Sequence, residues 1–141
     1  MIEARNFYIN GAWVPPVNAH DHHVIDPSTE DACAVISLGD QADTDAAVAA
    51  ATAAFPGWAA TDPETRAGYV RGILDQYEAR VEEMAEAISL EMGAPIDMAR
   101  SSQAPCLPWH LKSSLKAMEH MEWIRPLGPH APYVRIALVP I

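Results

Sequence analysis

The side chains best suited to nucleophilic chemistry lie close together at Cys106, Trp109 and His110. A cysteine beside a histidine can lose its proton, and the thiolate is the form that attacks a carbonyl carbon. Such a pair also needs an acid that orients the histidine and donors that hold the developing oxyanion. Neither is evident in the surrounding sequence, so we interpret Cys106 as a packed thiol and not as a nucleophile.

A second candidate is the run His20-Asp21-His22-His23, because imidazole and carboxylate groups bind transition metals. Its spacing indicates no distant fourth ligand, and it lies in a predicted polar connector. We therefore interpret it as a solvated loop; the alternative, metal sensing, requires tight zinc binding through His22 and His23. The remaining cysteine, Cys33, alternates with apolar residues in a predicted strand and is assigned to the core.

Composition excludes several classes of partner. The 141 residues carry a formal net charge of −10, which disfavours nucleic acid and anionic membranes as partners. The glycines form no phosphate-binding loop, no apolar run approaches the ~20 residues of a membrane span, and the N-terminus does not resemble a signal peptide. With 50% hydrophobic residues, the expected protein is soluble and cytoplasmic, with a real core.

One long helix is expected over residues 62–93, and the rest of the chain is expected to be arranged around it. Asp62 is a suitable N-cap, Pro63 suits the first helical position, and Gly93 followed by Pro95 is a typical end. Apolar residues between them recur at spacings of three and four. At about 1.5 Å per residue the helix would be roughly 40 Å long, which predicts a larger body for it to lie against.

Short strands are predicted on both sides of the helical region. Segment 7–14 is typical of a hairpin around an Asn10-Gly11 turn, and 24–36 of a second strand pair around Asp26-Pro27-Ser28-Thr29. The β-branched segment 133–139 predicts a last strand. Because the sequence stops directly after it, we expect that strand to have an unpaired edge.

Two further helical regions are predicted. An alanine-rich helix is expected to be capped by Asp43 or Thr44 and to end at Pro56-Gly57. The region after the long helix is expected to be helical and to be interrupted or kinked at Pro105 and Pro108, because proline cannot donate to the helical ladder.

Several motifs occur in a fixed order along the chain. They are Phe7-Tyr8-Ile9-Asn10-Gly11-Ala12-Trp13, Ile25-Asp26-Pro27-Ser28-Thr29, the alanine-rich 43–58, Arg66, and Leu90-Glu91-Met92-Gly93-Ala94-Pro95. In this order they resemble the N-terminal part of the aldehyde dehydrogenase superfamily over essentially the whole chain. The chain departs from the family at Glu30-Asp31, where Gly-Glu is usual, and at Ala94, where lysine is usual. Val139-Pro140-Ile141 resembles the lead-in to the family's next strand.

The resemblance implies an α/β fold with N-terminal hairpins, three main helices and a terminal strand. Residues 1–132 would pack on a coenzyme-binding domain, and 133–141 would begin an oligomerisation arm. The family's reaction uses a cysteine thiolate, NAD or NADP, and a glutamate that activates water. The resemblance places those groups beyond Ile141, so we expect no catalytic or cofactor-binding residue here and an inactive chain.

The resemblance also implies two sites within the chain. Ser102 and Cys106 match positions that line the aldehyde entry tunnel, and four-residue spacing allows one helix face to carry both; an ordinary buried helix face is the alternative. Glu91, with the main-chain carbonyl of Ile25 or Val24, matches positions that hold Na⁺ or K⁺; a carboxylate facing solvent is the alternative.

Two hypotheses about function follow. In the first, the chain is the N-terminal portion of a cytoplasmic NAD(P)-dependent aldehyde dehydrogenase that forms a homodimer or homotetramer when complete. In the second, it is a stand-alone binding or assembly module derived from such an enzyme. The absence of the expected catalytic residues favours the module, whereas the bare terminal strand favours the first hypothesis.

Overall fold

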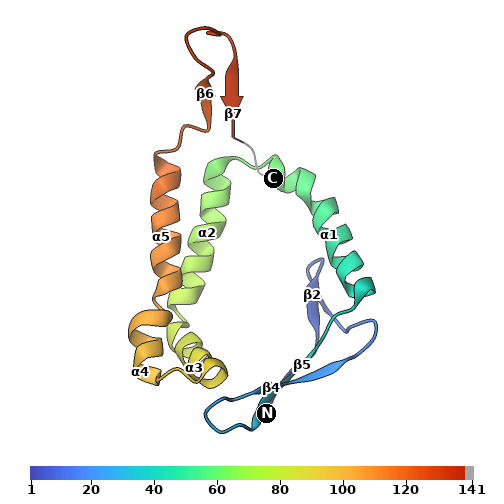
Figure 1. Cartoon of the computed structure of the whole chain (residues 1–141). Coiled ribbons are helices and arrows are strands. Elements are labelled where there is room, and N and C mark those ends of the chain that lie inside the picture. Colours follow the sequence, from blue (N-terminus) through green and yellow to red (C-terminus); the bar gives the residue numbers. More distant parts are fainter. Residues whose placement is uncertain (139–141) are drawn as a thin grey trace.

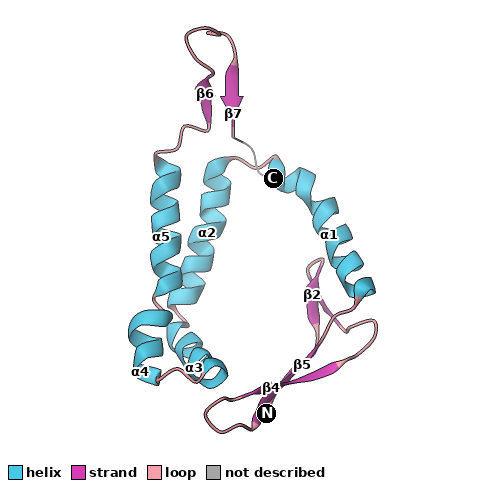
Figure 2. Cartoon of the chain, in the orientation of Figure 1, coloured by secondary structure: helices cyan, strands magenta, loops and turns pink. Residues whose placement is uncertain are grey.

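The computed structural model describes residues 1–138 of the chain. The strands are β1 (Ile2–Ala4), β2 (Phe7–Ile9), β3 (Ala12–Val14), β4 (Asp21–Ile25), β5 (Ala32–Ser37), β6 (Ile124–Pro126) and β7 (Arg135–Ala137). The helices are α1 (Gln41–Ala59), α2 (Pro63–Glu78), α3 (Val81–Met92), α4 (Ile96–Met98), the π-helical turn η1 (Ala99–Gln103) and α5 (Cys106–Glu119). Figure 2 shows this mixed α/β composition.

The N-terminal strands form a hairpin and a small mixed sheet. β2 pairs with β3, and both Asn10 and Gly11 have positive φ values of 52° and 79°, which confirms the predicted tight turn. β5 lies between β1, which is parallel to it, and β4, which is antiparallel. The predicted second strand pair is therefore confirmed, but His22 and His23 belong to β4, so their assignment to a connector was wrong.

The turn between β4 and β5 contains a residue under backbone strain. Glu30 has φ = 63°, a left-handed conformation that favours glycine, and its amide donates to the Asp26 carbonyl at 2.8 Å. This is the place where the family pattern has glycine.

We expect Glu30→Gly to stabilise this turn by about 1 kcal/mol, because it removes the Cβ that disfavours a positive φ. The measurement is amide hydrogen exchange at residue 30, with Asp31→Gly as the matched neighbouring change. Faster exchange after Glu30→Gly than in the unchanged chain would contradict the prediction.

Helix α1 begins and ends elsewhere than predicted. Asp40, and not Asp43 or Thr44, is the N-cap: its Oδ1 accepts from the amides of Ala42 at 2.8 Å and Asp43 at 3.1 Å. The helix also continues through Pro56 to Ala59. The Pro56 carbonyl still accepts from the Ala60 amide at 3.2 Å, so the proline removes one donor without ending the helix.

The predicted long helix is divided into α2 and α3. Both ends are as expected, because Asp62 Oδ1 accepts from the Thr65 amide at 2.9 Å and Gly93 adopts φ = 67°. The expectation of one continuous rod was wrong, since Arg80 lies between the two helices with φ = −125° and ψ = 19°. No proline or glycine marks this break in the sequence.

Tertiary packing accounts for the break. α3 turns so that Ala85 is buried against Ala99 and Ala104, and small side chains allow this close approach. α2 instead packs beside α5, with Leu74 buried on that side. One straight helix could not pack against both α5 and the segment that contains Ala99 and Ala104, so the chain changes direction between α2 and α3.

The two prolines after η1 begin a helix. Pro105 is the residue before α5 and Pro108 lies in its first turn, where backbone N–H groups have no partner within the helix. The π-helical turn before them closes with the Ala104 amide donating to the Ala99 carbonyl at 2.9 Å. The predicted interruption is therefore a change of helical type followed by a fresh helix start.

The last described elements form a hairpin. β7 pairs antiparallel with β6, which places Ile124 opposite Ala137. The sequence did not predict β6 as a partner of the terminal strand; within the described residues the two-stranded sheet leaves the other edge of β7 without a strand. At the base of this hairpin, Arg66 Cζ lies over the Trp123 ring, 5.6 Å from the ring centroid. The predicted role of Val139-Pro140-Ile141 lies outside the described residues.

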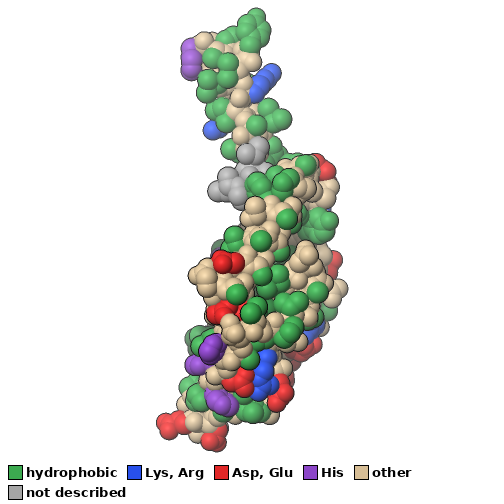
Figure 3. Space-filling view, turned by 90° about the vertical axis from the view of Figure 1, so that its right-hand side faces the viewer, with side chains coloured by type: hydrophobic (Ala, Val, Ile, Leu, Met, Phe, Trp, Pro, Cys, Tyr) green, Lys and Arg blue, Asp and Glu red, His purple; other side chains and the backbone are tan. Residues whose placement is uncertain are grey.

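The elements are arranged as an open arch (Figure 1). α1 and the N-terminal sheets form one side, α2 and α5 the other, and the β6–β7 hairpin projects beyond them. The accessible surface is 10177 Å², whereas a compact protein of 15.3 kDa exposes about 7,100 Å². Hydrophobic side chains lie across the visible surface (Figure 3), so the core that the described chain encloses is small.

No helix in residues 1–138 is long and apolar enough to cross a membrane.

Candidate functional site

The structure places Ser102 and Cys106 together where η1 leads into α5. The Cys106 thiol donates to the Ser102 carbonyl at 3.1 Å, and the Ser102 hydroxyl lies 3.4 Å from that of Ser101. Both residues are exposed in this chain. π-helical turns interrupt regular helices often at functional sites, and this one brings the two side chains to the same open surface.

Tyr77 is a neighbour that the sequence did not reveal. Its hydroxyl donates to the Ala104 carbonyl at 2.9 Å and so ties α2 to the end of η1. Burial raises the pKa of the Tyr77 phenol, and the nearby Cys106 thiol raises that pKa further. The phenol therefore stays protonated beside the thiol and acts as a hydrogen-bond donor.

The geometry does not assemble a nucleophile at Cys106. Its thiol is engaged with a backbone carbonyl, and the His110 ring lies against Trp109, with the ring centroids 4.7 Å apart. A base that activated the thiol would have to accept its proton. Cys106 was expected to be a packed thiol, whereas in this chain it is exposed.

The end of the helix that carries Glu91 meets the turn that follows the predicted carbonyl ligands. Gly93 ends α3 against the β4–β5 turn so closely that a Cβ at Gly93 would lie 2.8 Å from Pro27 Cγ. Glu91 is exposed in the last turn of α3. The residues alone did not predict the contact between Gly93 and Pro27. Only the family resemblance pointed to Glu91 and the strand carbonyls as cation ligands.

A β-bulge lies opposite the predicted carbonyl ligands, because Cys33 of β5 has no partner in β4. The register of β4 against β5 shifts between Val24 and Ile25, and a bulge interrupts regular backbone pairing. The Val24 carbonyl accepts from the Cys33 thiol at 3.4 Å. Carbonyl and carboxylate oxygens suit a hard cation such as Na⁺ or K⁺, so the donor types at this corner fit the implied ion.

The histidine run does not form a metal centre with other described residues. His22 and His23 are consecutive in β4 and therefore point to opposite faces. Asp21 is engaged by Arg5, whose Nε lies 2.9 Å from Asp21 Oδ1. Within residues 1–138, no group of three or more His, Cys, Asp or Glu side chains is placed to hold a metal ion.

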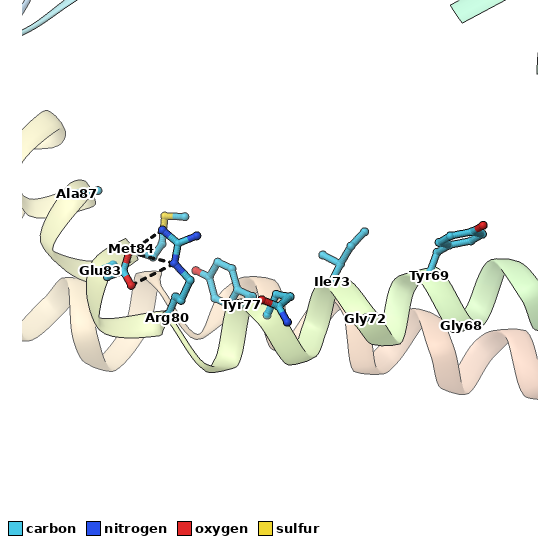
Figure 4. A pocket seen from close by; sticks show the side chains of 10 residues that line it. Gly68, Tyr69, Gly72, Ile73, Tyr77, Arg80, Glu83, Met84 and Ala87 are labelled. Carbon is cyan, nitrogen blue, oxygen red and sulfur yellow. Dashed lines mark hydrogen bonds and ion pairs between the residues drawn. The ribbon is translucent and has the colours of Figure 1, made fainter. Parts of the chain in front are cut away.

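A groove of about 790 Å³ runs along α2 and α3. Its lining residues are Gly68, Tyr69, Gly72, Ile73, Gln76, Tyr77, Arg80, Glu83, Met84 and Ala87. Tyr69, Ile73 and Met84 project to the same side of the two helices (Figure 4). Ile73 and Met84 belong to the apolar residues that recur at spacings of three and four in 62–93, yet Ile73 is 56% exposed.

Comparison with known proteins agrees with the resemblance. A sequence model described as the aldehyde dehydrogenase family matches residues 13–130. A curated relative, 3-succinoylsemialdehyde-pyridine dehydrogenase from a Pseudomonas species, is 36% identical over 129 residues, which is 91% of this chain and 27% of the relative. This chain therefore spans about a quarter of the length of the curated relatives that it matches.

Solved structures contain a similar backbone fold. The aldehyde dehydrogenase of Bartonella henselae is 48% identical with a TM-score of 0.89, covering 92% of this chain and 27% of that one. Aldehyde dehydrogenase C of Pseudomonas syringae, solved with NAD⁺ and octanal, is 41% identical with a TM-score of 0.85, covering 89% and 26%. The described fold matches the N-terminal region of these enzymes. Because the family match covers most of its length, the chain belongs to the aldehyde dehydrogenase family.

Proposed function

We propose that this chain is the N-terminal portion of an NAD- or NADP-dependent enzyme that oxidises an aldehyde to a carboxylic acid. The observation that carries the proposal is the match of the family model to residues 13–130. A relative of known structure binds NAD⁺ and octanal, which supports a dinucleotide and an aldehyde as the ligands of the complete enzyme.

In this proposal the reacting groups lie outside the chain. The complete enzyme would use a thiolate to form a thiohemiacetal, pass a hydride to NAD(P)⁺ and hydrolyse the resulting thioester. The two cysteines of the chain have other contacts: Cys33 donates to the Val24 carbonyl and Cys106 to the Ser102 carbonyl. The chain alone is therefore expected to be inactive.

The portion described here would support the active site. Residues 1–132 would pack on the coenzyme-binding domain, and 133–141 would begin the arm that forms a homodimer or homotetramer. The open arch and its exposed apolar surface support the first role, and the projecting β6–β7 hairpin supports the second. Ser102 and Cys106, exposed beside Tyr77, would line the entrance for the aldehyde.

The corner formed by Glu91 and the carbonyls of Ile25 and Val24 would hold a Na⁺ or K⁺ ion. The close contact of Gly93 with Pro27 supports this assignment, because it brings the end of α3 to the turn that follows Ile25. To test this ion site, potassium in the buffer is replaced by a bulky organic cation and the midpoint of thermal unfolding of the native product is measured. A midpoint that responds equally in the Glu91→Gln variant would rule the site out.

The experiment that tests the proposed function uses the native gene product, purified from its source. We expect an intact mass well above the 15.3 kDa of this chain and formation of reduced nicotinamide on addition of an aldehyde with NAD⁺ or NADP⁺. A product of 15.3 kDa without turnover would leave the stand-alone assembly module as the better account.

A further inference from the structure

The residue that closes the π-helical turn η1 has a buried carbonyl whose usual donor is missing. Ala104 is 0% exposed, and its backbone is helical, with φ = −60° and ψ = −36°. In a helix the carbonyl of residue 104 accepts from the amide of residue 108. That residue is Pro108, which has no N–H and whose ring crowds the same carbonyl. The helical pattern resumes one residue later, where the Trp109 amide donates to the Pro105 carbonyl at 3.2 Å.

Tyr77 supplies the donor that Pro108 lacks. Its hydroxyl, on α2, donates to the Ala104 carbonyl at 2.9 Å. Burial raises the pKa of the Tyr77 phenol, so the phenol remains protonated and able to donate. A buried carbonyl without a donor is costly, and Ala104 has no exposed surface through which water could reach it. The tyrosine hydroxyl therefore takes the place of a helical amide.

Residue 104 is thus held through both of its backbone polar groups. Its amide donates to the Ala99 carbonyl at 2.9 Å, which forms the π-helical bond, and its carbonyl accepts from Tyr77. Ala99 and Ala104 are also buried against Ala85 of α3. Small side chains fix one side of the turn and the tyrosine fixes the other, so the form of the turn depends on a residue that lies 27 positions earlier.

This turn carries the two side chains proposed to line the entrance for the aldehyde. Ser102 lies within η1 and Cys106 is the first residue of α5, so Ala104 lies midway between them. The Cys106 thiol donates to the Ser102 carbonyl at 3.1 Å. A change of helical type at Ala104 would rotate one side chain relative to the other around the helix axis. Their common direction therefore depends on the contact of Ala104 with Tyr77.

We propose that Tyr77 is a positioning residue for the aldehyde entrance. Its hydroxyl replaces the amide that Pro108 lacks and so holds the Ala104 carbonyl. The π-helical turn then keeps the form that directs Ser102 and Cys106 to one open surface. Tyr77 acts through the turn and does not touch the reacting atoms. This inference rests on the proposed function, because an aldehyde entrance requires that the complete enzyme oxidises an aldehyde.

The test compares variants of the native gene product in the oxidation of straight-chain aldehydes from propanal to octanal. Tyr77→Phe keeps the ring and removes only the donor, so the packing of α2 on α5 is expected to be retained. For octanal, KM is expected to rise about tenfold, the effect of losing one buried hydrogen bond. The value of kcat is expected to stay within about twofold, because the reacting groups are unchanged. Propanal reaches fewer side chains at the entrance, so its KM is expected to rise less than about threefold.

Pro108→Ala provides a rescue. It returns an amide to residue 108, and that amide can donate to the Ala104 carbonyl. The double variant Tyr77→Phe/Pro108→Ala is therefore expected to recover most of the octanal KM, whereas a tyrosine that only filled space would allow no such recovery. Hydrogen exchange of the Ala104 amide reports on the turn itself. It is expected to be about tenfold faster in Tyr77→Phe and to slow again in the double variant.

Tyr8→Phe is the matched control. Tyr8 is 63% exposed and packs edge-on against Trp13, with the ring centroids 5.3 Å apart. It belongs to β2, on the other side of the arch from α2 (Figure 1). Loss of this solvated hydroxyl is expected to leave both the octanal KM and the exchange of the Ala104 amide unchanged.

Two results would overturn the inference: Tyr77→Phe behaving as Tyr8→Phe does, or a loss in Tyr77→Phe that is equal for all aldehydes and is not rescued by Pro108→Ala. Turnover of octanal that is insensitive to Tyr77→Phe would leave the proposed function standing and refute the role of Tyr77. A native product that oxidises none of these aldehydes would count against the proposed function. Exchange of the Ala104 amide would then still decide whether the Tyr77 hydroxyl holds the turn.

Discussion

Replacing Gly93 by alanine is expected to destabilise the junction between α3 and the β4–β5 turn by about 2 kcal/mol. Gly93 has φ = 67°, and a Cβ there would lie 2.8 Å from Pro27 Cγ, so the substitution adds both backbone strain and a steric clash. The amide of residue 93 donates to the Ser89 carbonyl at 3.0 Å. Its protection against hydrogen exchange is expected to fall roughly thirtyfold.

Gly72→Ala is the control for this prediction. Gly72 lies within α2, and an added Cβ would meet no atom within 4 Å, so the same change there is expected to strengthen the helix by about 1 kcal/mol. Amide exchange in α2 is then slower than in the unchanged chain. If Gly93→Ala proved as mild as Gly72→Ala, the contact between the helix end and Pro27 would be refuted.

Removal of the Asp43 carboxylate is expected to have the second large effect. Asp43 is 6% exposed; its Oδ1 accepts from the Val17 amide at 2.9 Å and its Oδ2 from the Asp40 amide at 3.1 Å. Asp43→Ala leaves two backbone donors without their acceptor, at a cost of about 3 kcal/mol. Exchange of the Val17 amide is expected to accelerate about a hundredfold.

Asp45→Ala is the matched change for Asp43→Ala. Asp45 is exposed and accepts only from the Gln41 side chain, at 2.7 Å, among the contacts described, so its loss is expected to cost no more than about 0.5 kcal/mol. Asp43→Asn keeps one acceptor oxygen and is expected to lie between the two. Equal effects of Asp43→Ala and Asp45→Ala would show that Asp43 does not join α1 to the chain before β4.

The features predicted correctly from the sequence depend on neighbouring residues. The Asn10-Gly11 turn, the Asp62 cap and the Gly93 helix end each follow from the conformational preference of one or two residues. Such preferences act within a few residues, and no distant part of the chain needs to be known. The same reasoning explains why the strained Glu30 is visible as a departure from the family pattern.

The features that were missed depend on contacts between distant segments. The direction change at Arg80 is needed because Ala85 packs on Ala99 and Ala104, which follow it in the chain. The choice of Asp40 over Asp43 as the cap of α1 reflects the hydrogen bond of Asp43 to Val17. The spacing of apolar residues carries no information about either contact. The prediction therefore joined α2 and α3 into one helix and began α1 too late.

The candidate site was predictable only in part. Spacing alone allowed Ser102 and Cys106 to share a face, but it did not reveal the π-helical turn that brings them together or the Tyr77 hydroxyl beside them. The exposure of Ile73 was also unpredictable, because apolar periodicity marks a packed face whether its partner is present or absent. The groove on α2 and α3 became visible only when the fold was known.

Calorimetry of the isolated 141-residue chain tests most directly whether its apolar faces lack a second layer to pack against. A closed domain of this length unfolds in one cooperative transition that absorbs about 100 kcal/mol near 60 °C. We predict that the chain absorbs far less heat, over a broad temperature range, because its apolar faces have no second layer to pack against. A single sharp transition of the full size would contradict this account.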